Sequence, residues 1–347
     1  MNVPRLTAVF LTLLWISCLA PADAAQEFAK VGWVGAGVRW LDSDARSAAM
    51  GGAYTAVISG AQAAFWNMGA LALAERAFSG SFSNSEWISD TWVRSLSGSF
   101  GLAGFGVGGS ATWLGMDEQH VRTVYQPEGN GRSFDNSGFV GNLGGGLDLR
   151  RLFGDMPENL AVGAGAGFVY YQNSLANHTG EALDGDLGII VTYDYSPQFM
   201  LAGGYTIRNV FEQSMVFIEN EVRLERRDRL GFAATYTSAE DLLSGPLAKI
   251  ILALDGERVL FPEFDWDIGT KRAGAELCLA GIFSARGGFV LYSGDYYDVR
   301  WGLGLCLKPG NPFIPNLSGG IDFARIDHEL FKPYNYLSVH VSVDLQQ

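Results

Sequence analysis

The stretch that decides the fold alternates large apolar residues with small or polar ones: Asp186-Leu187-Gly188-Ile189-Ile190-Val191-Thr192-Tyr193-Asp194-Tyr195. A period of two places successive side chains on opposite faces of a β-strand. One face of this strand is apolar and compatible with lipid, whereas the other is mostly polar. Residues 297–308 and 337–345 repeat the alternation. This pattern is typical of strands that cross a bilayer within a closed barrel.

Segments of this kind continue along most of the chain. From about Arg76 to the end, Gly, Asn, Asp, Ser and Pro clusters separate about 14 of them, and bacterial barrels have an even number of strands. Sharing about 270 residues among 14 strands leaves roughly 19 for each strand and its connection, enough for short periplasmic turns and moderate outer loops. We therefore predict an all-β fold, a transmembrane antiparallel β-barrel of about 14 strands formed by residues 76–347.

The composition supports a barrel and argues against other classes of protein. The chain has 45 glycines, 18% charged residues and a formal net charge of -13, which makes nucleic acid an improbable partner. After Ala24 no strictly apolar run exceeds five residues, whereas a spanning helix needs about 20. Backbone groups in lipid must then be paired within a closed sheet.

The first residues predict export. Arg5 precedes an apolar stretch from Ala8 to Ala20, and the small residues Ala22 and Ala24 follow. This order is typical of a secretory signal peptide, so we assign residues 1–24 to the leader and expect export through the Sec pathway to the outer membrane of a double-membraned bacterium.

The three cysteines have separate expectations. Cys18 would be a lipoprotein anchor in an alternative interpretation, although Trp15 stands where a small aliphatic residue is expected. Cys278 and Cys306 fall on lumen-facing positions of strands separated by one strand, roughly 9–10 Å apart, beyond the roughly 7 Å limit for a disulfide. We expect two free thiols that fill space in the lumen. Their spacing matches no zinc pattern, and we expect no metal and no cofactor.

Residues 25–75 lack the alternation. The stretch from Gly60 to Glu75 is rich in alanine and has a partly helical pattern. A barrel of this size encloses more space than its side chains fill, so a small N-terminal segment can fold back inside it. We predict that residues 25–75 form a partly helical plug in the lumen.

Two runs in the plug region carry a family resemblance: Asp44-Ala45-Arg46-Ser47-Ala48-Ala49-Met50-Gly51-Gly52-Ala53-Tyr54-Thr55-Ala56-Val57 and Ala64-Phe65-Trp66-Asn67-Met68-Gly69-Ala70-Leu71-Ala72. They resemble the N-terminal pattern of the PorV/PorQ family, which belongs to the same broad superfamily as the FadL-type fatty acid transporters. Further likeness lies at Gly274–Leu277, Ala285–Gly288, Gly302–Leu305 and Asp322–Ala324. Two features depart from the family: Met68-Gly69 replaces the Pro-Ala of its Asn-Pro-Ala turn, and the chain ends on Gln347 instead of an aromatic residue.

The resemblance implies a 14-stranded outer-membrane barrel with an N-terminal plug, and two functions for it. The first is passage of a hydrophobic solute across the outer membrane. The alternative is a component of the type IX secretion system that binds secreted proteins and hands them over. Expected partners are outer-membrane lipid together with either a hydrophobic small molecule or secreted proteins.

Six plug residues are candidate site residues: Arg46, Met50, Gly51, Gly52, Trp66 and Asn67. Arg46 is expected to pair with carboxylates of the wall, and Asn67 to bond exposed backbone. Adjacent glycines at 51 and 52 allow a tight turn. We expect these residues to build the plug, and a second role as a gate stays open.

A second candidate site is the predicted loop from Asp255 to Gly269. It combines acidic residues with five large apolar ones: Val259, Leu260, Phe261, Phe264 and Trp266. Such a loop suits a hydrophobic ligand entrance or a partner surface, unless it partly extends two strands and its aromatic residues lie at the membrane interface. Asp265 and Asp267 have a spacing compatible with calcium, but a full run of oxygen ligands is missing.

Two other patterns have simple structural interpretations. The charged run from Glu219 to Arg229 predicts a solvated rim, with lipopolysaccharide phosphates as a possible ligand. Gly104, Gly106 and Gly109 spell G-x-G-x-x-G, but no βαβ unit surrounds them. We interpret these glycines as a smooth inner wall that the plug can approach closely.

We find no pattern typical of an enzyme. The sequence has no G-x-S-x-G elbow and no metal-binding histidine spacing, and its four histidines are scattered at His120, His178, His328 and His340. His340 falls on the polar face of the last strand, where a single hydrogen-bonded histidine is commoner than a general base. We therefore predict that the protein is not an enzyme.

Overall fold

The computed structural model describes residues 37–345 apart from 58–59, 74–76, 88–90, 103, 118, 123, 128, 130, 155, 176–177, 218–219, 243–244, 261–268, 293–295, 308–315 and 330. The predicted signal peptide, Cys18 and most of the predicted apolar loop lie outside these residues. Among the described residues, no helix is both long and apolar enough to cross a membrane.

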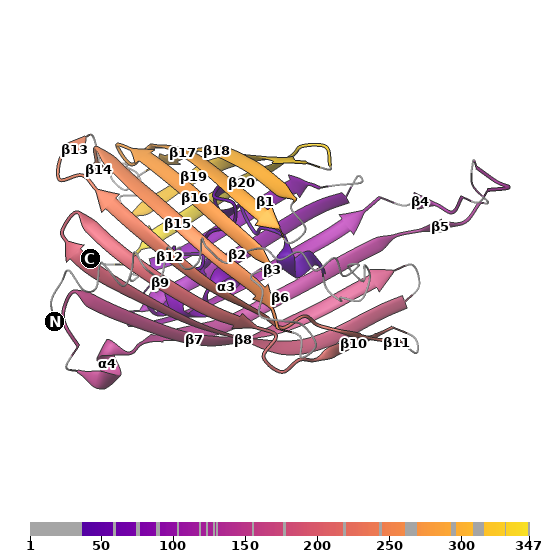
Figure 1. Ribbon diagram of the computed structural model, residues 1–347, viewed down its shortest axis with the longest axis horizontal. Helices are drawn as coiled ribbons and strands as arrows, with labels where there is room; N and C mark the ends of the chain where they lie inside the picture. Colours follow the sequence, from indigo (N-terminus) through magenta and orange to yellow (C-terminus); the bar gives the residue numbers. More distant parts are fainter. Residues whose placement is uncertain are drawn as a thin grey trace.

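Fourteen antiparallel strands form one closed barrel, as predicted (Figure 1). Each strand pairs with its neighbours in chain order, and the last pairs with the first through partners such as Ala77 and Asp344. The strands are β1 Ala77–Glu86, β2 Thr91–Leu102, β3 Phe105–Met116, β6 Asn136–Asp148, β7 Leu160–Leu175, β8 His178–Ser196, β9 Phe199–Arg208, β12 Arg227–Thr237, β15 Ala248–Val259, β16 Thr270–Leu279, β17 Phe283–Tyr292, β18 Tyr297–Leu307, β19 Leu317–His328 and β20 Tyr334–Asp344.

Three short hairpins and five short helices complete the described structure. The hairpins are β4 Gln119–His120 with β5 Ser133–Phe134, β10 Ser214–Phe217 with β11 Asn220–Arg223, and β13 Asp241–Leu242 with β14 Gly245–Pro246. The helices are η1 Gly37–Trp40, α2 Ala45–Ala49, α3 Ala63–Trp66, η2 Met68–Leu73 and α4 Arg150–Phe153.

The two ends of the barrel differ. β1 begins and β20 ends at the same end, which we call the terminal end. The opposite end carries the β4–β5 and β10–β11 hairpins and is called the loop end (Figure 1). The connections at the loop end include the longest of the described chain, Asp117 to Asp135 and Asn209 to Arg226.

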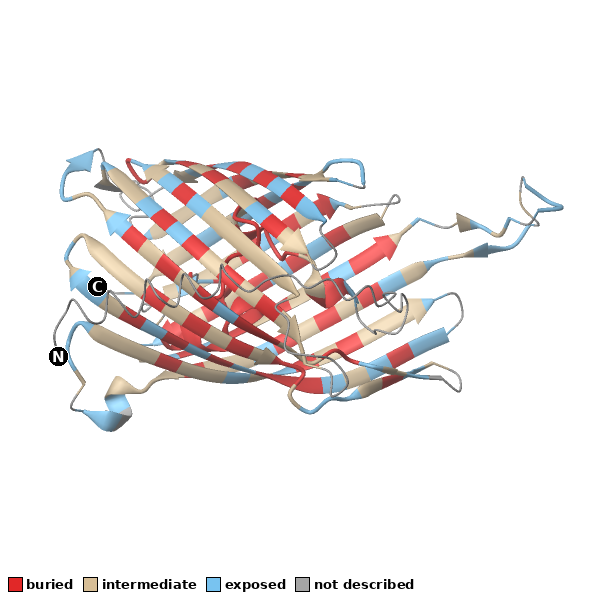
Figure 2. Cartoon of the chain, viewed as in Figure 1, coloured by how far each residue is buried: buried red, intermediate tan, exposed pale blue. Residues whose placement is uncertain are grey.

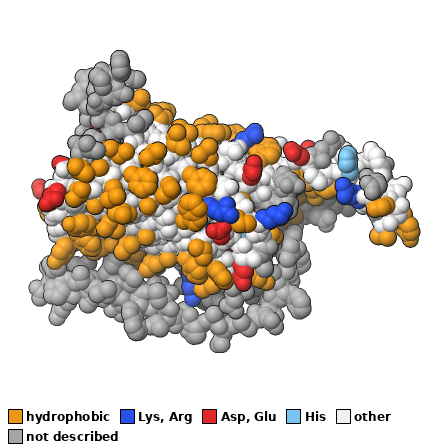
Figure 3. Space-filling model, turned by 90° about the horizontal axis from the view of Figure 1, so that it is seen from above, with side chains coloured by type: hydrophobic (Ala, Val, Ile, Leu, Met, Phe, Trp, Pro, Cys, Tyr) orange, Lys and Arg blue, Asp and Glu red, His pale blue; other side chains and the backbone are white. Residues whose placement is uncertain are grey.

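The alternation in the sequence separates the two faces of the wall as expected. Leu187 and Ile189 are 46% and 48% exposed on the outside, whereas Asp186 and Ile190 are 5% and 0% exposed inside. Figure 3 shows hydrophobic side chains over most of the visible outer wall, with charged side chains toward the strand ends. An apolar band of this kind is what a lipid-facing barrel surface requires.

The four N-terminal helices lie inside the barrel and fill much of its lumen. α2 packs against β17 to β20, and η2 packs against β3 and β6 to β8 on the other side. The residues of this inner segment are mostly buried, as the red ribbon within the barrel shows (Figure 2). The small side chains of α2 and η2 let the helices approach the wall closely.

Candidate functional site

The helix α2 is fixed to the wall from its first turn. Asp44 is its N-cap, and its carboxylate accepts a hydrogen bond from the Ser47 N–H at 2.9 Å. Burial raises the pKa of the Asp44 carboxyl, and the bond from Ser47 opposes this rise. The Ala45 N–H donates to Ser338 Oγ on β20 at 2.7 Å. The plug therefore has a defined position relative to the strand that closes the barrel.

After α2 the plug backbone lies directly on the wall. Gly51 and Gly52 have φ angles of +68° and +67°, a conformation that favours glycine. A Cβ at Gly288 of β17 would lie 2.2 Å from Gly51 N, and one at Gly274 of β16 would lie 2.4 Å from Met50 O. Both wall positions therefore require glycine.

Glycines receive η2 in the same way on the opposite wall. A Cβ at Gly165 of β7 would lie 2.3 Å from Met68 O, and one at Gly106 of β3 would lie 2.1 Å from Leu71 O. Gly106 fits the interpretation of the G-x-G-x-x-G run as inner wall. That interpretation is wrong for Gly104, which lies in a turn with φ +81°, and for Gly109, which alternates to the outer face beside Leu143. The plug is thus seated between two glycine-rich surfaces.

This seating predicts different effects at two adjacent glycines. Gly288→Val should lower the free energy of unfolding by about 1–3 kcal/mol or more, because overpacking at the plug contact forces backbone to move. Gly287 points outward with nothing within 4 Å of an added Cβ, so Gly287→Val should change it by less than about 0.5 kcal/mol. Urea unfolding in detergent micelles measures both. Equal effects would contradict the assigned plug contact.

Ion pairs also connect the plug to the wall. Arg46 donates to both carboxylate oxygens of Glu276 on β16, at 2.7 and 2.9 Å. Arg39 binds Asp186 on β8 at 2.5 Å, and Asp42 binds Arg300 on β18 at 2.6 Å. These bonds reach the wall from three directions, and most of the charged groups involved are buried.

Asn67 and Trp66 are held between plug and wall. The Asn67 amide donates to Thr55 O at 2.9 Å and to Ile189 O of β8 at 3.1 Å, and its oxygen accepts the Gly69 N–H at 3.0 Å. The Trp66 ring packs on Phe65, with centroids 5.2 Å apart. All six predicted plug residues therefore touch the wall or brace the plug, while a gating role for them stays a prediction.

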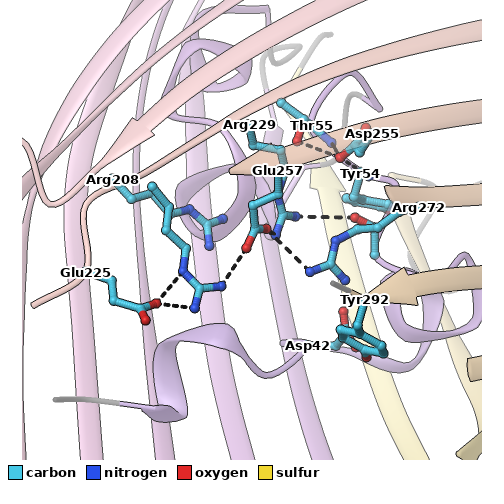
Figure 4. Close-up of polar contacts among 12 residues, drawn as sticks. Asp42, Tyr54, Thr55, Arg208, Glu225, Arg229, Asp255, Glu257, Arg272 and Tyr292 are labelled. Carbon is cyan, nitrogen blue, oxygen red and sulfur yellow. Dashed lines mark hydrogen bonds and ion pairs between the residues drawn. The ribbon is translucent and has the colours of Figure 1, made fainter. Parts of the chain in front are cut away.

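A buried network of charges lies between the plug and β9 to β16 (Figure 4). Glu257 on β15 accepts hydrogen bonds from Arg227 at 2.6 Å, from Arg272 at 3.4 Å, and from Arg229. Arg227 also binds Glu225. One carboxylate thus binds three guanidinium groups in a buried part of the lumen.

A second carboxylate of β15 holds the plug backbone in the same region. Asp255 accepts the N–H groups of Tyr54 and Thr55, both at 3.0 Å, and the Thr55 hydroxyl at 2.7 Å. The Arg208 guanidinium donates to Phe65 O at 3.0 Å and lies 5.7 Å from the Trp66 ring centroid.

This network corrects one prediction and decides between two alternatives for another. The run from Glu219 to Arg229 was expected to form a solvated rim, but Glu225 and Arg229 are buried. For the predicted loop from Asp255, the alternative that it partly extends a strand is confirmed: β15 continues to Val259 and places Asp255 and Glu257 on its inner face. Register pairs Arg229 with Glu257 across β12 and β15. Residues expected to be in water therefore face one another.

Of the five large apolar residues of the predicted loop, only Val259 and Leu260 are described. Val259 ends β15 and is paired with Arg227, and the Leu260 N–H donates to Arg226 O at 2.8 Å. The other large apolar residues of the loop lie outside the described residues, and so do Asp265 and Asp267 with their calcium-compatible spacing. These apolar residues are Phe261, Phe264 and Trp266. The role of this loop stays a prediction.

At the loop end the lumen is apolar along β2, β3, β6 and β7. Five inward-facing wall residues form a buried cluster with Val38 of η1 and with residues of the β10–β11 hairpin region. The cluster members are Val93, Leu114, Val140, Val169, Tyr171, Val38, Met215 and Leu224. Water-filled barrels have a polar lumen, and this apolar side, which we call the apolar mouth, differs from that pattern. The sequence signal for it was the unbroken apolar run Phe168–Tyr171, which gives β7 apolar residues on both faces.

Both cysteines lie in the lumen near the terminal end. Cys278 and Cys306 are free, as predicted, and both line a cavity of about 580 Å³ between the plug and the terminal end. Among the described residues no group of His, Cys, Asp and Glu side chains is suited to hold a metal ion.

The fold and the lumen together define a plugged, 14-stranded barrel of the outer-membrane type. Solved structures with this fold include the CymD monoaromatic hydrocarbon channel, with a TM-score of 0.55 at 11% identity, covering 88% of this chain and 98% of that chain. The Ralstonia pickettii toluene transporter TbuX gives 0.55 at 11% identity over 87% and 98%. The Pseudomonas putida toluene transporter TodX gives 0.53 at 11% identity over 85% and 96%.

No family model and no curated protein matches the sequence. The structural likeness confirms the predicted FadL-like barrel at the level of fold. Membership of the PorV/PorQ family stays a prediction.

Proposed function

We propose that this protein spans the outer membrane of a double-membraned bacterium and allows a small hydrophobic solute to cross it. The observation that carries the proposal is the apolar mouth, because inward-facing valines there would bind an apolar molecule rather than water. The apolar outer wall and the fold shared with hydrocarbon channels support it. The longer connections at the loop end favour an orientation with this end at the cell exterior.

Entry of a solute would begin at the loop end. Val38, Met215 and Leu224 cover the wall valines, so a solute replaces these side chains as it enters. Each Å² of apolar surface that the solute buries contributes about 25 cal/mol of binding free energy. This contribution offsets the free-energy cost of moving the hairpin. Beyond the mouth the plug occupies the lumen, and further passage requires its contacts to Glu276, Asp186 or Arg300 to part.

The test places a carboxylate in the apolar mouth. Val140→Asp should slow uptake of labelled toluene by intact cells about tenfold or more. A factor of ten corresponds to about 1.4 kcal/mol, and an unpaired carboxylate in an apolar site costs more than that. Asn142 lies two residues further along the same inner face and already bonds Ser110. Asn142→Asp is therefore the matched control and should keep uptake near that of the wild type.

Both variants must reach the membrane in equal amounts as folded, heat-modifiable barrels for the comparison to count. Unchanged toluene uptake by Val140→Asp would contradict the proposal. Among the described residues and the similar structures, nothing favours the alternative role in type IX secretion or a secreted-protein partner.

A further inference from the structure

Three neighbouring strands bring a thiol and an imidazole together at the terminal end of the lumen. Gly320 on β19 is paired with Cys306 on β18 and with His340 on β20. A Cβ at Gly320 would lie 2.7 Å from His340 Cε1 and 2.9 Å from His340 Nε2. The missing side chain opens the space in which the ring lies, and Nε2 comes to 3.9 Å from Cys306 Sγ.

A carboxylate orients the same ring from its other nitrogen. Asp322, two residues beyond Gly320 on the same face of β19, places Oδ2 3.1 Å from His340 Nδ1. Arg286 of β17 donates to the other oxygen of Asp322 at 2.6 Å and fixes it. Since the carboxylate holds Nδ1–H, the second nitrogen is directed at the sulfur. The result is an Asp–His–Cys relay on the inner wall.

We propose that Cys306 is an activated thiol and a modification site for low-molecular-weight disulfides that reach the lumen. An imidazolium beside a thiol favours the thiolate, which is the nucleophilic form. Cys278 lines the same cavity without an imidazole beside it among the described residues. The two thiols share one compartment and differ in their nearest partner.

The reaction is thiol–disulfide exchange. The Cys306 thiol releases its proton to water, and the His340 imidazolium stabilises the resulting thiolate. The thiolate attacks one sulfur of the small disulfide, and the disulfide S–S bond breaks as a new one forms to Cys306. The leaving thiolate takes a proton from water. The small disulfide is the oxidant, so that no other reactant is needed.

The surroundings of Cys306 favour modification of its thiol over a role as the nucleophile of a hydrolase. The Cys306 N–H already donates to Ile282 O at 2.7 Å, so it is not available to stabilise an oxyanion. The side chain of His340 is 35% exposed, which leaves room for a small reagent. Under the proposed orientation the cavity lies toward the periplasm, an oxidising compartment. Charged groups that line the cavity with this relay are Asp44, Arg46, Lys249, Glu276, Arg286 and Asp322.

The experiment compares the two thiols in one barrel. In a Cys18→Ser background, Cys278→Ser leaves Cys306 and Cys306→Ser leaves Cys278, and each detergent-solubilised protein reacts with dipyridyl disulfide at pH 6. Ordinary thiols are almost entirely protonated there, so Cys306 should react at least about tenfold faster than Cys278. The rate advantage should shrink as the pH rises toward 9. Equal rates at pH 6 would overturn the proposal.

Two further variants separate activation from exposure. His340→Gln keeps a polar side chain and should remove the rate advantage of Cys306 at pH 6, while the rate of Cys278 in its own single-cysteine protein stays the same. Asp322→Asn should reduce the advantage in part, because the ring loses its orientation. A Cys306 rate that is unaffected by His340→Gln would show that access alone sets reactivity, and the relay would then be rejected.

Discussion

Glu257→Gln is expected to lower the free energy of unfolding by about 3–5 kcal/mol, because it removes the charge that compensates several buried cations. Arg227, Arg229 and Arg272 all bind Glu257. Glutamine has nearly the same shape, so the change removes charge and leaves packing intact. Urea titration in detergent, followed by the loss of the fast-migrating folded band on gels, measures the difference.

The matched control is an exposed ion pair of the same chemistry. Glu212 binds Arg226 at 2.7 Å, with side-chain exposures of 52% and 33%. Glu212→Gln should cost less than about 1 kcal/mol, because solvent screens such a pair. If the two variants unfold at the same urea concentration, the charges around Glu257 are hydrated and not buried as the structure has them.

The strands could be predicted from the sequence because their signal is local. Lipid and lumen impose opposite polarity on adjacent residues, so that residues 186–195 show both faces within ten positions. The strand count followed from repeated local patterns, and so did the positions of the two free cysteines.

The charge network could not be predicted, because it depends on register between strands. Glu257 lies 28 residues from Arg229 in sequence and 15 from Arg272. Nothing in the run near Arg229 indicates which residues will face it across β12 and β15. A dense run of charges whose partners cannot be read from the local sequence resembles a solvated rim. That interpretation was wrong for Arg229.

The apolar mouth and the relay at His340 were missed for related reasons. Val140 and Val169 lie on inner faces, which the alternating strands predicted to be mostly polar, and these faces become apolar toward the loop end. His340 was taken as a single satisfied histidine. Its partners Cys306 and Asp322 come from other strands, and a glycine between them creates the contact.

The ion pairs between the plug and the wall differ in how much their loss would cost. The ion pairs contact β8, β16 and β18. They differ in whether the wall residue keeps another partner when the plug residue is removed. Glu276 keeps a second partner, Arg286, at 2.5 Å when Arg46 is removed. Loss of Arg46 therefore loosens the plug without leaving a wall carboxylate unpaired. Loss of Arg300 would remove the ion pair of Asp42 and leave Asp298 with Tyr292 and His328. The contact at Arg46 is the one that can part with least cost.

Deletion of residues 25–75, with residues 1–24 retained, is expected to raise leakage of small polar solutes about tenfold or more, because an unfilled lumen of this size admits water. Liposome swelling with a small sugar measures the leakage. The wall strands begin at Ala77, outside the deletion. Heat-modifiable migration on gels establishes that the barrel remains closed, which separates a lost plug from a lost fold.

Arg46→Ala tests the same idea in a chain that keeps its plug. The variant should give leakage between that of the wild type and that of the deletion, since α2 keeps its bond from Ala45 to Ser338 but loses two bonds to Glu276. Arg94→Ala, which removes an exposed cation of β2, should leave leakage unchanged. If folded barrels that lack residues 25–75 swell no faster than the wild type, the N-terminal segment does not seal the lumen, and the graded effect at Arg46 loses its basis.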